Sequence, residues 1–224
     1  MTEDQRRAIP FAVRAAIASV AMAIFLIVLK SYAAWSTGSI AMLGSLADSG
    51  LDLLASAVTL YGVRLAAQPA DHDHRVGHGK AEALAALFQV MLITASAAGI
   101  AWRAIVALGS SEPTQGAEFG IGVSLIAIFA TMVLLAYQRA VIRRTGSVAI
   151  VADNVHYQSD VLLNGSVIVA LVLDQYLGFL LPAPLFALLL PLFLPFLPFL
   201  PSSPPLPPFF SLLLLPSFSA SFFF

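Results

Sequence analysis

The stretch Ser45-Leu46-Ala47-Asp48-Ser49-Gly50-Leu51-Asp52 places two carboxylates four residues apart inside a long apolar segment. Residues four apart lie on one face of a helix, so Asp48 and Asp52 are predicted to point the same way. At about 100° per residue, the polar residues around them fall within roughly 100° of arc; these are Ser45, Ser49, Ser56 and Thr59. A carboxylate at mid-membrane costs about 2.5–3.5 kcal/mol on insertion scales, so the pair needs a partner. We interpret that partner as a metal ion.

The composition of the whole chain is that of an integral membrane protein. Of its 224 residues 59% are hydrophobic and 10% are charged, and the mean hydropathy is +0.91. A soluble domain usually carries about 25% charged residues. The absence of cysteine excludes disulfides, thiolate metal sites and cysteine nucleophiles. No dense basic patch is interleaved with aromatic residues, so we expect no nucleic-acid partner.

The apolar segments predict an all-α fold, an integral membrane helical bundle with five clear spans and a degraded sixth. Pro10 suits the start of the first helix. The apolar run that follows is long enough to span and has no small-residue cleavage site after it, so it is not a signal peptide. The five predicted spans are residues 11–29, 40–65, 81–108, 119–141 and 148–173.

Basic residues are distributed unequally between the two sides of the predicted membrane. They gather before the first span, after the second and after the fourth, which places these segments in the cytoplasm by the positive-inside rule. We therefore expect a multi-pass protein of the cell membrane with a cytoplasmic N-terminus. Lys30 and Arg103 are exceptions that we expect to snorkel from helix ends. The residues that set the orientation are Arg6, Arg7, Arg14, Arg64, Arg75, Lys80, Arg139, Arg143 and Arg144.

A second pair of ligand-type residues lies in the fifth predicted span, in His156-Tyr157-Gln158-Ser159-Asp160. If this face meets that of the second span, Asp48, Asp52, His156 and Asp160 supply three oxygens and one imidazole. This set suits a tetrahedral divalent transition metal such as zinc, with Fe²⁺, Cd²⁺ or Co²⁺ as other candidates. The alternative is an interhelical hydrogen-bond network without metal. Two further polar residues of the same face are assigned a supporting or packing role, namely Asp153 and Asn164.

The loop Asp71-His72-Asp73-His74-Arg75-Val76-Gly77-His78 contains three of the four histidines of the chain. It is a candidate second metal site, formed by Asp71, His74 and His78. The alternative is a merely polar loop. Lys80 and Glu82 are interpreted as capping or pairing residues at the start of the third helix.

These three clusters together resemble the cation diffusion facilitator family, in particular its zinc and ferrous-iron efflux branch. The match is carried by the Asp-x-x-x-Asp spacing of Ser45 to Asp52 and by the His-x-x-x-Asp spacing of His156 to Asp160. Between them it is also carried by Gln68-Pro69-Ala70-Asp71 and His78-Gly79-Lys80-Ala81-Glu82. The resemblance covers roughly residues 11–188.

The resemblance implies a six-span domain that works as a homodimer and is followed by a cytoplasmic metal-binding domain. By resemblance, Asp48, Asp52, His156 and Asp160 are the transport site, and Asp71, His74 and His78 are the loop site. The pattern is similar to that of zinc-selective members, whereas manganese-type members tend to carry a carboxylate where His156 stands. No catalytic or cofactor-binding residues are expected, because the metal is the transported substrate.

The end of the chain departs from the family pattern. From Pro182 onward it consists of Pro, Leu, Phe and Ser, with prolines at 191, 195, 198 and 201. Each proline costs about 3 kcal/mol in a helix interior. We interpret the change as a loss of the reading frame between Pro182 and Pro191, or else as a hydrophobic low-complexity tail. The predicted domains are a cytoplasmic tail at 1–10, a transmembrane cation-efflux domain at 11–188 and a tail at 189–224 without a soluble domain.

The leading functional hypothesis is efflux of a divalent metal cation, most favourably Zn²⁺, in exchange for protons across the lipid bilayer. Metal binding needs deprotonated carboxylates and a neutral imidazole, so metal and protons compete for one site. The alternatives are a non-functional truncated transporter and a membrane metal-binding protein without transport. An enzyme is not expected, because the sequence has no nucleotide-binding glycine loop, nucleophile–base constellation or zinc-hydrolase motif.

Overall fold

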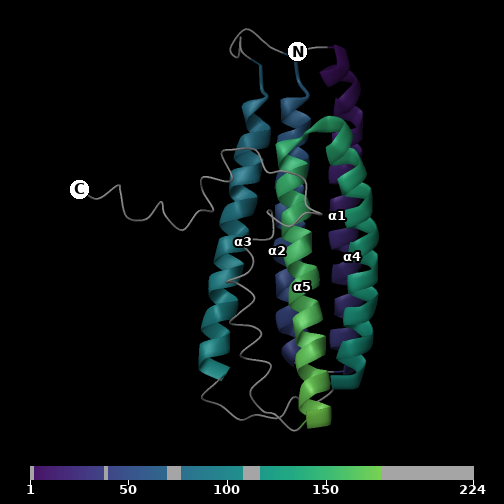
Figure 1. The fold of residues 1–224 in the computed structure, drawn as a ribbon, viewed down its shortest axis with the longest axis vertical. Helices are drawn as coiled ribbons and strands as arrows, with labels where there is room; N and C mark the ends of the chain where they lie inside the picture. The colour runs from purple at the N-terminus through teal and green to yellow at the C-terminus, as the bar shows by residue number, and fades with distance from the viewer. Residues whose placement is uncertain (1–2, 38–39, 70–76, 108–116, 178–224) are drawn as a thin grey trace, which may run out of the picture.

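The computed structural model describes residues 3–37, 40–69, 77–107 and 117–177. Within these residues the chain is entirely helical and contains no strand. The helices run alternately up and down as one elongated bundle, with α3 at one edge, α1 and α4 at the other, and α2 and α5 between them (Figure 1). They are α1 (Glu3–Thr37), α2 (Ile40–Ala66), α3 (Lys80–Ala107), α4 (Ala117–Thr145) and α5 (Val148–Leu177).

Three of these helices are long and apolar enough to cross a membrane, over Ile9–Ser36, Lys80–Gly99 and Gly122–Thr145. They belong to α1, α3 and α4. The prediction of five clear spans and a sixth is therefore corrected to five helices with three candidate spans among the described residues. The remaining two, α2 and α5, contain Asp52, His156 and Asp160, the ligand-type residues predicted from the sequence. The degraded sixth span and the tail at 189–224 lie outside the described residues.

The first helix begins earlier than predicted. It starts at Glu3, and Pro10 lies inside it rather than at its first turn. A proline removes one hydrogen bond to the carbonyl four residues before it, and here this loss falls close to the helix end. The helix therefore continues through residues that the sequence assigned to a tail.

The turn between α4 and α5 is specified by two residues. Gly146 follows α4 with a φ of +63°, a left-handed conformation that glycine adopts without penalty, and its N–H donates to the carbonyl of Ile142 at 2.9 Å. Ser147 then caps α5, because its Oγ accepts from the backbone N–H of Ile150 at 3.4 Å. The turn sets α5 antiparallel to α4 with its polar face toward the bundle.

Glu82 stabilises the start of α5 from another helix. Its Oε2 accepts hydrogen bonds from Ser147 Oγ at 2.9 Å and from the backbone N–H of Val148 at 3.1 Å. A carboxylate at a helix N-terminus also interacts favourably with the helix dipole. The prediction that Glu82 serves the start of the third helix is corrected: it lies in the first turn of α3 but bonds α5.

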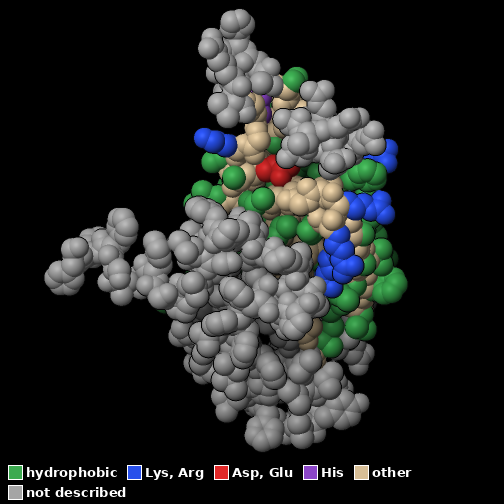
Figure 2. All heavy atoms as spheres, turned by 45° about the horizontal axis from the view of Figure 1, so that its top comes forward, with side chains coloured by type: hydrophobic (Ala, Val, Ile, Leu, Met, Phe, Trp, Pro, Cys, Tyr) green, Lys and Arg blue, Asp and Glu red, His purple; other side chains and the backbone are tan. Residues whose placement is uncertain are grey.

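Basic residues gather at one end of the bundle. Arg64 lies in the last turn of α2, Lys80 begins α3, and Arg143 and Arg144 lie in the last turn of α4. Figure 2 shows Lys and Arg side chains around this end. The Arg144 guanidinium lies 5.8 Å from the ring centroid of Phe11, which ties the ends of α1 and α4.

Lys30 was predicted to snorkel from a helix end, and the structure places its side chain elsewhere. Its side chain is buried, with 7% of the residue exposed, and Nζ donates to the carbonyl of Ser45 on α2 at 3.3 Å. The ammonium therefore lies between α1 and α2, inside the bundle.

Small residues allow the helices to approach closely. Where α1, α4 and α5 meet, the buried core is rich in alanine, including Ala12, Ala15, Ala16 and Ala149. One close approach is at Gly62, where an added Cβ would lie 2.5 Å from the Cβ of Ala85 and 3.0 Å from the carbonyl oxygen of Ala81. The distance between α2 and α3 thus depends on the missing side chain at position 62.

We expect Gly62→Ala to lower the free energy of unfolding by about 1–3 kcal/mol, since overpacking forces the two helices apart. Thermal unfolding of the protein in detergent micelles, followed by circular dichroism, measures the effect. Gly50→Ala is the matched control, because a Cβ there would meet nothing within 4 Å. Equal melting temperatures for the two variants would contradict the assignment.

Candidate metal centre

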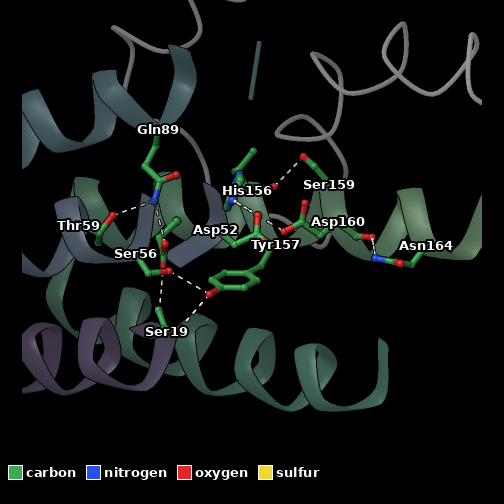
Figure 3. Close-up of polar contacts among 12 residues, drawn as sticks. Ser19, Asp52, Ser56, Thr59, Gln89, His156, Tyr157, Ser159, Asp160 and Asn164 are labelled. Atoms are coloured by element: carbon green, nitrogen blue, oxygen red, sulfur yellow. Dashed lines mark hydrogen bonds and ion pairs between the residues drawn. The ribbon is translucent and has the colours of Figure 1, made fainter. Parts of the chain in front are cut away.

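The structure brings the ligand-type residues of α2 and α5 together. Asp52, His156 and Asp160 each offer one ligand atom, and these atoms lie within 4.8 Å of one another. His156 Nε2 is 3.2 Å from Asp52 Oδ1 and 3.9 Å from Asp160 Oδ2. Figure 3 shows the imidazole directed toward both carboxylates in the middle of the bundle.

The spacing of these atoms suits a divalent transition metal. With metal–ligand distances of about 2.0–2.2 Å, the ligand atoms of a tetrahedral ion are about 3.3 Å apart. The Asp52–His156 distance already has this value within a few tenths of an ångström. Asp160 Oδ2 is buried and accepts no hydrogen bond from the described residues, so it can turn to a cation. Two carboxylates and one imidazole, with the imidazole buried, are ligand types that a divalent transition metal uses.

Asp48 is the fourth predicted ligand and is not one of these three residues. The buried face of α2 contains Ser49, Asp52, Ser56 and Thr59, whereas Asp48 is exposed at the margin of that face. The three-residue cluster therefore forms without it. Asp48 lies one helical turn from Asp52, within reach of the same region. Its assignment as a ligand stays a prediction.

The predicted loop site is described only in part. Asp71 and His74 lie outside the described residues. His78 is half-buried just before α3, where its carbonyl accepts from the backbone N–H of Ala81 at 2.9 Å. The loop site therefore also stays a prediction.

Tyr157 fixes α5 against two other helices beside the cluster. Its hydroxyl donates to the carbonyl of Ser19 on α1 at 3.0 Å, so the 3.0 Å contact with Ser56 on α2 has the serine as donor. Its ring meets that of His156 edge-on at 5.8 Å. Ser56 is one turn from Asp52, and Tyr157 is next to His156. The Tyr157–Ser56 hydrogen bond therefore fixes the register of α5 against α2, and the Tyr157–Ser19 hydrogen bond fixes it against α1.

Three buried polar residues that sequence reasoning missed surround this region: Ser19 on α1, Gln89 on α3 and Gln138 on α4. Each is fully buried and hydrogen-bonded to Asp153 of α5. The signal that could have found them is a lone polar side chain inside an apolar span, which is costly without a partner.

A bundle of long apolar helices, with a carboxylate–imidazole cluster buried between two of them, defines a membrane protein of the cation-handling class. Residues 16–197 match the family described as "Cation efflux transmembrane domain". The chain belongs to this family, the cation diffusion facilitators, and the resemblance expected from the sequence is confirmed. It is accordingly a transporter-family protein rather than an enzyme.

Curated relatives agree with this assignment. The chain is 49% identical over 174 residues to the "Cation-efflux pump FieF" of Yersinia pestis (strain Pestoides F) and to that of Yersinia pseudotuberculosis serotype O:3 (strain YPIII). The alignment covers 78% of this chain and 58% of each relative. The chain thus spans less than two thirds of the length of the relatives it matches.

Replacing Tyr157 by Phe removes two buried hydrogen bonds. At about 0.5–1.5 kcal/mol each, we expect the free energy of unfolding to fall by about 1–3 kcal/mol. Tyr61→Phe is the control, because Tyr61 is 67% exposed. Melting temperatures of the two variants in the same detergent measure the difference, and an unshifted Tyr157→Phe protein would show that the hydroxyl does not hold the helices.

Proposed function

We propose that this protein exports a divalent metal cation from the cytoplasm in exchange for protons, with Zn²⁺ as the favoured substrate and Fe²⁺, Cd²⁺ and Co²⁺ as others. The observation that carries the proposal is the meeting of Asp52, His156 and Asp160 between α2 and α5. Membership of the cation efflux family supports it. The printed name of the relatives, a cation-efflux pump, points to the same activity.

In this proposal α2 and α5 also cross the membrane, with their polar faces turned to the bundle interior. The basic end of the bundle, together with the N-terminus, faces the cytoplasm of a cell-membrane protein. Asp48 is proposed as the fourth ligand, which turns in from one turn away when the ion binds. Asp71, His74 and His78 would form a cytoplasmic loop site, and a homodimer is proposed from the family resemblance.

The exchange follows from the chemistry of the ligands. Carboxylates and imidazole bind a metal only in their proton-free forms, so arrival of the ion at Asp52, His156 and Asp160 releases protons. Reprotonation from the opposite side would then favour release of the ion there. An inward proton gradient thereby drives the metal outward, provided that the cluster opens to one side at a time.

Asp52→Ala is expected to abolish metal-stimulated proton flux, because it removes the ligand closest to His156. The purified chain is reconstituted into liposomes with an internal pH-sensitive dye, and Zn²⁺ is added outside. Glu82→Gln is the matched control, since it neutralises a carboxylate that bonds the start of α5 and lies outside the cluster. Flux in Asp52→Ala equal to that of the unmodified chain would refute the proposal. Saturable Zn²⁺ binding without flux in the unmodified chain would favour a metal-binding protein that does not transport.

The four proposed ligands are expected to contribute unequally to affinity. Asp52→Asn and Asp160→Asn should each weaken Zn²⁺ binding at least about tenfold more than Asp48→Asn, a difference of about 1.4 kcal/mol. The reason is that Asp52 and Asp160 already lie beside His156, whereas Asp48 has to turn inward. Competition titrations with a coloured zinc chelator in detergent micelles give the dissociation constants. Equal losses for all three variants would show that Asp48 is as fully engaged as the others.

A further inference from the structure

Asp153 is a carboxylate of α5 that lies one turn before His156 and is fully buried. Three donors from three other helices reach it. Its Oδ2 accepts from Ser19 Oγ of α1 at 2.6 Å and from Gln138 Nε2 of α4 at 2.7 Å, and its Oδ1 accepts from Gln89 Nε2 of α3 at 2.9 Å. Figure 3 shows Gln89 and Ser19 on the two sides of this region.

The remaining helix joins the network through Gln89. Its Nε2 also donates to Thr59 Oγ1 of α2 at 2.8 Å, so residues from all five described helices are linked to one carboxylate. Breaking any one of these contacts leaves a buried carboxylate with too few hydrogen-bond donors. The network therefore stabilises one packing arrangement of the five described helices.

One chain of hydrogen bonds among the neighbouring amides runs toward Asp153. Gln158 donates to Asn154, Asn154 Nδ2 donates to Gln138 Oε1 at 2.9 Å, and Gln138 in turn donates to Asp153. This chain joins the three direct contacts, so several polar side chains converge on the carboxylate of Asp153.

This arrangement separates Asp153 from the proposed ligands. Three donors occupy three of the roughly four acceptor positions of its carboxylate. Asp160, by contrast, has a buried oxygen that accepts no hydrogen bond from the described residues. Asp153 is therefore committed to the protein, whereas Asp160 has an oxygen available for a cation.

Ser19 connects the network to the position of the imidazole. Its hydroxyl bonds Asp153 and its carbonyl accepts from Tyr157, so one residue of α1 holds α5 on both sides of His156. These two hydrogen bonds restrain the rotation of α5 about its axis and its position along that axis. With these fixed, His156 Nε2 faces Asp52 at 3.2 Å.

We propose that Asp153 is the positioning residue of the metal site: its carboxylate, held by Ser19, Gln89 and Gln138, keeps α5 in the rotation that directs His156 at Asp52 and Asp160. The proposal rests on the proposed function, since it concerns the geometry of the same site. It assigns Asp153 no contact with the metal.

The test is Co²⁺ binding to the full chain in detergent micelles, because visible absorption of Co²⁺ reports the geometry of its ligands. Asp153→Asn replaces one of the two acceptor oxygens by an N–H donor, so at least one of the three donors now held by Asp153 faces another donor. Because Asp153 acts through the position of α5 rather than through a ligand, we expect Co²⁺ binding to weaken by at least about tenfold, with an altered Co²⁺ spectrum.

The decisive variant is the exchange Asp153→Asn with Gln138→Glu, which swaps the amide and the carboxylate. The asparagine then donates to the new carboxylate, which can still accept from Asn154. We expect the exchange to restore the Co²⁺ spectrum and most of the lost affinity, while Gln138→Glu alone does not. If Asp153→Asn alone fails to fold, recovery of both folding and Co²⁺ binding in the exchange variant carries the same conclusion.

Thr94→Val is the matched control. Thr94 lies on α3 outside the site and the network, and its hydroxyl donates to the carbonyl of Val90 in its own helix at 2.8 Å. We expect its Co²⁺ affinity to be unchanged. Co²⁺ binding of Asp153→Asn equal to that of the unmodified chain, or no recovery in a well-folded exchange variant, would overturn the proposal.

The outcome is also separable from that of the proposed function. Asp52→Ala is titrated alongside and is expected to lose Co²⁺ binding. If Asp52→Ala binds Co²⁺ normally, the metal site itself is refuted and the positioning role falls with it. If Asp52→Ala loses binding and Asp153→Asn does not, only the positioning role is refuted.

Discussion

A carboxylate inside an apolar helix bundle must be met by a cation or by hydrogen-bond donors, and α5 contains both solutions within three turns. Asp153 is compensated by Ser19, Gln89 and Gln138. Asp160 lies near His156 with an oxygen that takes no hydrogen bond from the described residues. Since an uncompensated charge costs several kcal/mol, helix packing depends on the first being satisfied. The second is the natural place for a mobile charge to bind.

The packing of small residues makes this arrangement possible. Alanines where α1, α4 and α5 meet, and Gly62 between α2 and α3, bring the helix backbones close enough for short polar side chains to reach one another. Hydroxyls as short as those of Ser19 and Ser56 can then bond across helix interfaces. Close packing and polar contacts therefore depend on each other.

Periodicity predicted the polar faces of α2 and α5, because two residues four apart share a face whatever the rest of the fold does. That the two faces meet follows from the spacing of ligand types, and the Asp52–His156 contact agrees with it. Other features could not be predicted from residue spacing. Spacing alone could not show that Asp48 lies at the margin of its face, or that Lys30 is buried, because both depend on how neighbouring helices are rotated. Gln89 and Gln138 lie on helices that carry none of the predicted ligands, so no local pattern could join them to Asp153. Glu82 was assigned to its own helix since its reach to α5 is a tertiary contact.

The double attachment of Ser19 has a mechanical consequence. Because a single residue bonds α5 through both its hydroxyl and its carbonyl, α1 and α5 cannot slide past each other without breaking both links at once. Helix α3 packs mainly on α2 and α5, and its polar links to these helices include those of Gln89 and Glu82. A displacement of α5 therefore either carries α1 with it or breaks these two buried hydrogen bonds.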